Sequence, residues 1–386
     1  MSHSKDLSHV NVSLYFHIPF CTRKCSYCHF YVLPDKSSFK AQLADALEQE
    51  WAIRLPLLKD KRIVSIYFGG GTPALFGAAA IERILQRIQC TTHLSNDCEI
   101  TLEANPENVN LQLMKEYRSA GVNRISIGLQ TLDDQLLPRL GRLHTAQKGI
   151  DAVLMANQVG FFNISVDLMY ELPNQTLESW HSTLEKASTL PLTHISLYNL
   201  TIEPETRFFK QRAALQPLLP DQETGAQMYR SALHLLENAG LLQYEISAFA
   251  KPTYSSKHNI GYWTARPFLG FGPSAFSYWE GKRFQNVPHF NQYLQACAEN
   301  RPAIGFEEVL EPQARLKELL AVQLRLTEGV HLPDFEEQHG KLPLSLRKTI
   351  ADLEVKGMLW QCCTSHKLSL TQKGLFFYDT VATELI

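Results

Sequence analysis

Residues 12–28 read VSLYFHIPFCTRKCSYC, a short run of β-branched and aromatic residues followed at once by a loop with three cysteines. The run Val12–His17 has the composition of a strand. Three thiolates on one loop suit a soft metal centre, and the thiols concerned are Cys21, Cys25 and Cys28. Two assignments are open at this point. Zinc would need a fourth ligand such as His17 or His29, whereas an iron–sulfur cluster held by three thiolates leaves one iron open.

The same strand-then-helix order continues along the chain. We predict strands over residues 12–17, 63–68, 99–104, 123–128, 163–169 and 194–200, and helices over residues 38–55, 78–88, 111–120, 145–158, 177–189 and 224–239. Such alternation is typical of βαβ units and a parallel sheet. Six units in about 230 residues favour an α/β fold built on a partial (βα)6 barrel of the TIM type. A doubly wound open sheet is the alternative, because periodicity does not separate the two.

From about Arg301 the order changes. The pattern predicts helices over residues 313–326, 332–339 and 345–356, a small hairpin from residues 359–361 and 367–369, and a last helix over residues 374–383. Three helices and a hairpin resemble a winged-helix module, so we divide the chain into residues 1–300 and 301–386. Such modules often bind DNA, but no strongly basic recognition helix is present here, which favours a packing or lid role.

Composition and charge narrow the class of protein further. The chain is 45% hydrophobic, and 37 Lys and Arg against 39 Asp and Glu give a net charge of −2, which argues against a protein that coats nucleic acid. No apolar run approaches about 18 residues, so no stable membrane insertion is expected. The polar start, residues 1–11, shows no secretory signal. We therefore expect a cytoplasmic protein whose eight cysteines are reduced thiols.

Polar and glycine residues gather where the predicted strands end. Because the carboxyl ends of parallel strands meet at one edge, we expect these residues to form one site. The turn GGGTP, residues 69–73, is neither GxGxxG nor a P-loop, and its bare backbone suits an amino-acid-like ligand. Carboxylate and amide oxygens of Glu103, Gln130 and Asp167 would accept from ribose hydroxyls and an amine, and Arg142 would pair with a carboxylate.

Five segments carry a resemblance to a known family: YFHIPFCTRKCSYCHF, YFGGGTP, LEANPE, SIGLQTLDDQLLPRLGRLH and DLMYELPNQT. They resemble the HemN/HemW branch of the radical S-adenosylmethionine (SAM) superfamily, and the likeness runs through essentially the whole chain, including a small HemN-type C-terminal domain. The resemblance implies a [4Fe-4S] cluster on the three clustered cysteines and SAM beside it. In the coproporphyrinogen III dehydrogenases of this branch, which hold two SAM molecules, the matching positions are Tyr15, Gly70 and Glu103 for the first, and Tyr27, Gly71, Thr72, Gln130, Arg142 and Asp167 for the second.

Two departures separate this chain from the dehydrogenases. Where they have a further cysteine, this sequence has Phe30, and only fourteen residues precede Tyr15 where they carry a longer arm. Both features match the heme-chaperone subgroup, whose HNxxYW motif corresponds to residues 258–263, HNIGYW. The resemblance then implies that His258 ligates heme iron while Tyr262 and Trp263 pack on the macrocycle, next to the glycine-rich stretch 268–278. A buried histidine that stabilises the barrel mouth is the structural alternative.

These features leave the following expectations. The first is a heme chaperone with a [4Fe-4S] cluster, SAM and heme, which delivers heme to acceptor apoproteins such as respiratory hemoproteins; no residue receives a catalytic role. The alternative is an oxygen-independent coproporphyrinogen III dehydrogenase. A zinc-stabilised DNA-binding protein leaves the strand-end residues unexplained. The sequence leaves open whether the protein is a homodimer, and what His17 does.

Overall fold

The structure is a computed structural model and describes residues 10–386. Most of the polar start, on which the prediction about a signal rests, lies outside the described residues. Six parallel strands pair in the order of the sequence: β1 (Val10–Ile18), β4 (Lys61–Gly70), β5 (His93–Ala104), β6 (Arg124–Gln130), β7 (Asn163–Tyr170) and β8 (His194–Asn199). The helices that follow them are α1 (Ser37–Arg54), α2 (Ala78–Thr91), α3 (Leu111–Ser119), α5 (Ala146–Gln158), α6 (Leu177–Ser188) and α9 (Gln222–Asn238). These elements confirm the predicted (βα)6 order.

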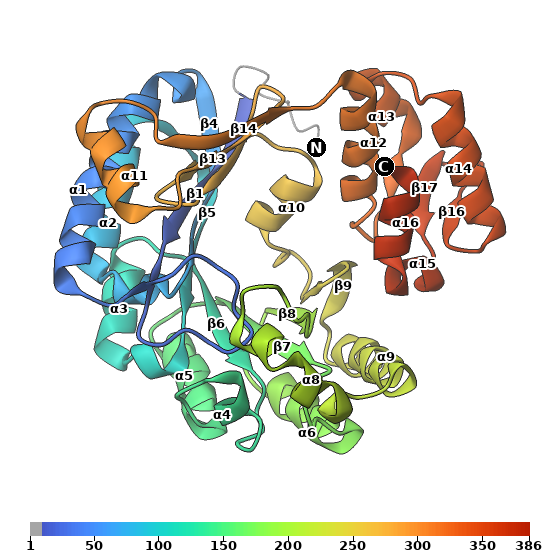
Figure 1. Cartoon of the computed structure of the whole chain (residues 1–386), viewed down its shortest axis with the longest axis horizontal. Coiled ribbons are helices and arrows are strands. Elements are labelled where there is room, and N and C mark those ends of the chain that lie inside the picture. Colours follow the sequence, from blue (N-terminus) through green and yellow to red (C-terminus); the bar gives the residue numbers. More distant parts are fainter. Residues whose placement is uncertain (1–9) are drawn as a thin grey trace.

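The sheet curves into a partial barrel, with the helices on its outer side (Figure 1). In the described part of the chain it does not close, because its two outermost strands, β14 (Ile304–Val309) and β9 (Leu242–Glu245), are not neighbours. Between β14 and β1 lie β13 (Lys282–Asn286), β12 (Phe276–Trp279) and β11 (Phe268–Phe271), and β10 (Ala248–Ala250) separates β8 from β9. The partial barrel is therefore correct, and the sequence pattern had missed both edges.

The glycine-rich stretch 268–278 has a structural reason for its glycine. It forms β11, β12 and the turn between them, and β11 pairs in parallel with β1. A Cβ atom on Gly270 would lie 2.1 Å from the carbonyl oxygen of Phe276, so only glycine fits this close approach.

The six parallel strands alternate between two buried environments. In β6, for example, Ile125, Ile127 and Leu129 belong to the hydrophobic core between sheet and helices. The alternate residues of this strand, among them Arg124 and Ser126, face the barrel interior, and they too are buried. Since side chains alternate across a strand, one strand supplies both an apolar outer layer and a polar interior.

The C-terminal elements form a separate unit beside the barrel (Figure 1). They are α12 (Pro312–Gln323), α13 (Leu332–His339), α14 (Leu344–Val355), α15 (Gln372–Phe376), α16 (Tyr378–Leu385) and the three-stranded sheet of β15 (Val330–His331), β17 (Lys367–Leu370) and β16 (Leu359–Gln361). This unit has its own hydrophobic core. Because β14 pairs with β13 in the large sheet, we propose a boundary near residue 310. No helix within residues 10–386 is long and apolar enough to span a bilayer.

Candidate functional site

The three clustered cysteines lie on a loop that is fixed at several points. The strand β2 (Phe20–Cys21) pairs in parallel with β3 (Leu33–Pro34), and the amide of Ser26 donates to the carbonyl oxygen of Leu140 at 2.9 Å. The thiols of Cys21, Cys25 and Cys28 all line one cavity of about 420 Å³. Burial raises the pKa of Cys21 to about 11 and also raises that of Cys28, so in the metal-free protein both are thiols.

The carboxyl ends of the parallel strands form the other walls of this cavity. Eight of the nine residues predicted to bind SAM line it: Tyr27, Gly70, Gly71, Thr72, Glu103, Gln130, Arg142 and Asp167. The ninth, Tyr15, does not line the cavity; its hydroxyl lies 3.2 Å from Nδ1 of His17. The sequence pattern missed Asn105 and Tyr198, which also line the wall. Asn105 directly follows the predicted strand 99–104, and Tyr198 lies near the end of the predicted strand 194–200; these positions were the signal that could have found them.

The GGGTP turn fits against the cysteine loop rather than offering free N–H groups. A Cβ atom would lie 2.5 Å from the His17 ring at Gly70, where φ is +112°, and 2.7 Å from the Phe20 carbonyl oxygen at Gly71. The amide of Gly70 donates to Glu103 at 3.2 Å, that of Gly71 to Ile18 and that of Thr72 to Phe20. These three amides are therefore bonded within the protein, and the two glycines are required by close packing. The ring of His17, whose role the sequence left open, packs against Gly70 and so supports this turn.

Two half-buried carboxylates share the floor of the cavity. Glu103 accepts from the Tyr67 hydroxyl at 2.8 Å, and burial, followed by the charge of Asp167, raises the pKa of Glu103 to about 7. Burial also raises the pKa of Asp167. Arg124 lies deeper in β6 at 2% exposure, and its Nε has no partner among residues 10–386. Its positive charge lowers the pKa of both carboxyl groups and so opposes the effect of burial. A ligand with a cationic group would lower both pKa values further and stabilise the two carboxylates in their charged form.

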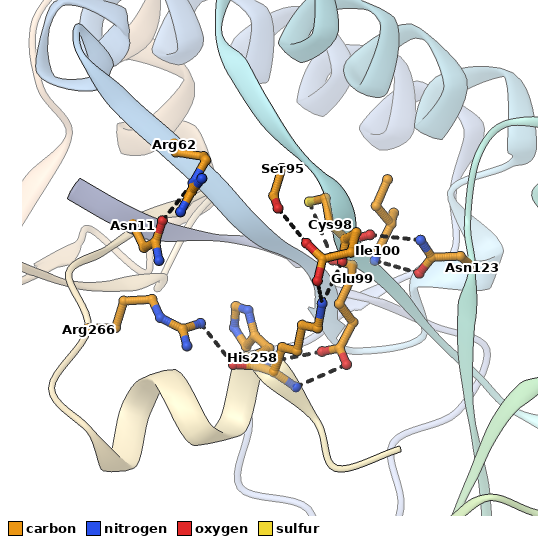
Figure 2. Close-up of polar contacts among 11 residues, drawn as sticks. Asn11, Arg62, Ser95, Cys98, Glu99, Ile100, Asn123, His258 and Arg266 are labelled. Atoms are coloured by element: carbon orange, nitrogen blue, oxygen red, sulfur yellow. Dashed lines mark hydrogen bonds and ion pairs between the residues drawn. The ribbon is translucent and has the colours of Figure 1, made fainter. Parts of the chain in front are cut away.

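The HNxxYW motif lies on the opposite side of this floor. It forms α10 (Lys257–Trp263), and the Glu99 carboxylate caps the start of the helix by accepting from the amides of Lys257 and His258, each at 3.0 Å (Figure 2). The His258 ring packs 4.9 Å from the ring of Tyr67, whose hydroxyl binds Glu103. The motif therefore contacts the cavity from behind and does not line it.

Both ring nitrogens of His258 are bonded within the protein. Ser65 Oγ donates to Ser13 Oγ, so it accepts from Nδ1 of His258 at 3.0 Å. That assignment leaves Nε2 to accept from the Tyr262 hydroxyl at 2.8 Å. The ring is 1% exposed, and burial lowers the pKa of His258 to about 3, so it is neutral. In this conformation a heme iron would have to displace Tyr262 to reach Nε2.

Trp263 connects the motif to the C-terminal unit. The guanidinium of Arg325 lies 4.2 Å from the Trp263 ring centroid and 5.1 Å from that of Tyr378. Arg325 also pairs with Glu245 of β9 at 3.4 Å. A cation between two aromatic faces is a stabilising arrangement, so one arginine joins α10, β9 and the C-terminal helices.

Comparisons with known proteins agree with this geometry. The family model of the Radical SAM superfamily matches residues 15–187, and that of the HemN C-terminal domain matches residues 310–377. Heme chaperone HemW of Bacillus subtilis (strain 168) is 34% identical over 349 residues, covering 90% of this chain and 92% of the relative. Heme chaperone HemW of Escherichia coli (strain K12) is 38% identical over 383 residues, covering 96% and 97%. The solved structure of coproporphyrinogen III oxidase (HemN) from Escherichia coli, a radical SAM enzyme, superposes with a TM-score of 0.86 over 98% of this chain and 90% of that one, at 24% identity.

The two family models thus identify a radical SAM protein with a HemN-type C-terminal domain, as the sequence predicted. The structural likeness to HemN concerns the fold alone. Relatives with 34% and 38% identity extend over nearly the whole chain. The chain therefore belongs to the HemW family of the radical SAM superfamily. A radical SAM domain implies a [4Fe-4S] cluster and SAM as its cofactors.

Proposed function

We propose that this chain is a heme chaperone that holds a [4Fe-4S] cluster and SAM and delivers heme to acceptor apoproteins in the cytoplasm, such as respiratory hemoproteins. One observation carries the cofactor part: three thiols from a single loop and the ends of the neighbouring strands line the same cavity. Membership of the HemW family supports the heme part.

The residues present fit a cluster better than a zinc ion. Three thiols from one loop line the cavity. Zinc would require four ligands at about 2.0–2.3 Å. A cluster would take one thiolate at each of three irons and supply a one-electron reductant and an open iron. We therefore assign Cys21, Cys25 and Cys28 to the cluster.

The remaining cavity residues suit a zwitterionic adenosyl ligand. Glu103 and Asp167 supply negative charge for the cationic part of SAM, and Gln130 supplies an amide. Arg142 supplies the only buried cation of the lining residues within the described chain; Arg23 and Lys24 on the same wall are exposed. The wall of the cavity is also formed by Tyr27, Gly70, Gly71 and Thr72. Tyr15 does not line the cavity, and we expect it to support the wall through its contact with His17. We propose that these residues hold SAM next to the open iron.

For heme we propose His258, with Tyr262 and Trp263, in a state in which Tyr262 has released Nε2. Neutral imidazole is the form that ligates iron, and burial keeps His258 neutral. Release of one hydrogen bond would free its lone pair. The competing role for His258 is structural: its buried hydrogen bonds would stabilise the barrel mouth. An experiment can separate this role from heme ligation.

His194 provides a matched control for that experiment. It is 0% exposed, and its Nδ1 and Nε2 contact Ser165 Oγ at 2.8 Å and the Tyr244 hydroxyl at 2.9 Å, the same pattern as in His258. We expect His258→Ala to shift or remove the Soret band of heme-loaded protein, and His194→Ala to lower Tm with the band unchanged. If both variants lose Tm and keep the wild-type heme spectrum and affinity, the heme role of His258 is wrong.

A second expectation separates the chaperone from the dehydrogenase. Phe30 stands where the dehydrogenases carry a further cysteine, and its exposed ring lines the cavity. Reduced protein with SAM should therefore leave coproporphyrinogen III unchanged, as measured by chromatography of the porphyrins under anaerobic conditions. Formation of protoporphyrinogen IX would favour the enzyme.

A further inference from the structure

Two side chains of the cavity wall point a hydrogen-bond donor at a cluster thiol. Nη1 of Arg142 lies 3.5 Å from Sγ of Cys25, and Oγ1 of Thr72 lies 3.7 Å from Sγ of Cys21. The two contacts come from different segments, the turn after β4 for Thr72 and the loop after α4 (Leu137–Leu140) for Arg142, and they reach different cysteines. Donors to cluster sulfurs favour the reduced, more negative cluster, so both contacts bear on its reduction potential.

One residue, Asn105, connects these two donors. Its Oδ1 accepts from Nη2 of Arg142 at 2.7 Å, and its Nδ2 donates to Oγ1 of Thr72 at 2.9 Å. Because the Thr72 oxygen accepts from Asn105, its own hydrogen is free to donate to Cys21. The carboxamide thus fixes the direction of both contacts, one through each of its ends.

The surroundings hold this arrangement in place. Nη2 of Arg142 also donates to the carbonyl oxygen of Gly128, and Arg142 is 7% exposed. A Cβ atom on Gly128 would lie 3.1 Å from both Nη2 of Arg142 and Oδ1 of Asn105, so the absence of a side chain lets the two groups meet. Asn105 itself does not contact a thiol; it acts through its two neighbours.

We propose that Asn105 is a positioning residue for the cluster, which directs Arg142 to the Cys25 thiolate and Thr72 to the Cys21 thiolate and thereby raises the reduction potential of the cluster. The inference rests on the proposed cluster. It gives Arg142 and Thr72 a second role besides the contact with SAM.

The test compares Asn105→Leu with Asn108→Leu. Asn108 lies three residues further along, and its Nδ2 donates to Thr22 Oγ1 of the same cysteine loop at 3.2 Å, but it contacts no thiol. Each reconstituted protein is assayed for iron and sulfide and then titrated with dithionite without SAM, with the reduced cluster followed by EPR. At a fixed potential we expect the ratio of oxidised to reduced cluster to be about tenfold higher in Asn105→Leu than in wild type. This ratio corresponds to a shift of about −59 mV in the one-electron reduction potential of the cluster. Asn108→Leu should match wild type.

The outcomes separate this inference from the proposed function. Wild-type protein that takes up no iron would overturn the proposed cluster and this inference with it. A loaded Asn105→Leu protein with the wild-type potential, or an equal shift in Asn108→Leu, would overturn the inference alone. If Asn105→Leu loses its cluster, Thr72→Val is titrated instead, since it removes the hydroxyl that donates to Cys21 and accepts from Asn105, and it leaves the contact of Arg142 with Cys25 in place. An unchanged potential in that variant also overturns the inference.

Discussion

Iron should be absent from anaerobically reconstituted protein in which Cys21, Cys25 or Cys28 is replaced by alanine, whereas wild type should take up about four irons per chain. Each thiolate would bind a different iron, so the loss of any one removes a corner of the cluster. The measurement is iron and sulfide content together with the charge-transfer absorbance. The three thiols line one cavity, which is why we expect the same loss from each variant.

Two other cysteines provide the controls. Cys90 is exposed, and Cys98 is buried in β5 with its pKa raised to about 12 by burial. Neither lines the cavity, so alanine at either position should leave the iron content unchanged. Stoichiometric zinc without sulfide in wild type would show that the cluster assignment is wrong.

Binding of SAM should weaken roughly tenfold to a hundredfold in Glu103→Gln, with the iron content unchanged. Loss of a charged hydrogen-bond partner costs about 1.5–3 kcal/mol, and Glu103 is a carboxylate of the cavity floor that contacts no cysteine. Calorimetric titration of the reconstituted protein with SAM measures the effect. Glu107→Gln is the matched control, because Glu107 pairs with His144 at 3.1 Å and does not line the cavity. Equal affinities in Glu103→Gln and wild type would remove Glu103 from the site.

The pH dependence of that affinity follows from the same carboxyl group. The pKa of Glu103 is raised to about 7, so below pH 7 the group is mostly protonated and neutral. A cationic ligand would have to release that proton, and the affinity of wild type should therefore rise between about pH 6 and pH 8. A glutamine side chain has no such proton, so the Glu103→Gln variant should lose this part of the dependence. A flat profile in wild type would contradict the raised pKa.

The sequence predicted the six parallel strands because their apolar runs are separated by clear helices, and the order of these elements fixes where the strand ends meet. It missed the edge strands β9 to β14. Those are short, and β11 contains glycine at a position where a carbonyl oxygen approaches too closely for a side chain. The pattern of residue types does not predict such a contact, because Gly270 and Phe276 come together only when β11 and β12 pair.

The sequence predicted part of the candidate site and missed the rest, again because some of its contacts join residues that are distant along the chain. Residues at strand ends, such as Glu103 and Asp167, were found because parallel topology alone brings them to one rim. The roles of neighbouring groups depend on side-chain geometry. Asn105 was passed over although it lies in the EANP segment, since its importance comes from contacts with Arg142 and Thr72. The sequence also did not show that both nitrogens of His258 are bonded, because Ser65 is distant along the chain.

The two-sided burial of the parallel strands has a consequence for how such proteins diverge. Outward positions such as Ile125 and Ile127 carry the apolar area whose burial stabilises the fold. Inward positions such as Ser126 and Gln130 contribute little of that area, yet they decide which molecules fit the barrel. Selection for a new ligand can therefore act on alternate residues of the same strand without eroding the free energy of folding. A lineage that retains the outer set can exchange one chemistry for another through small, separately tolerated steps.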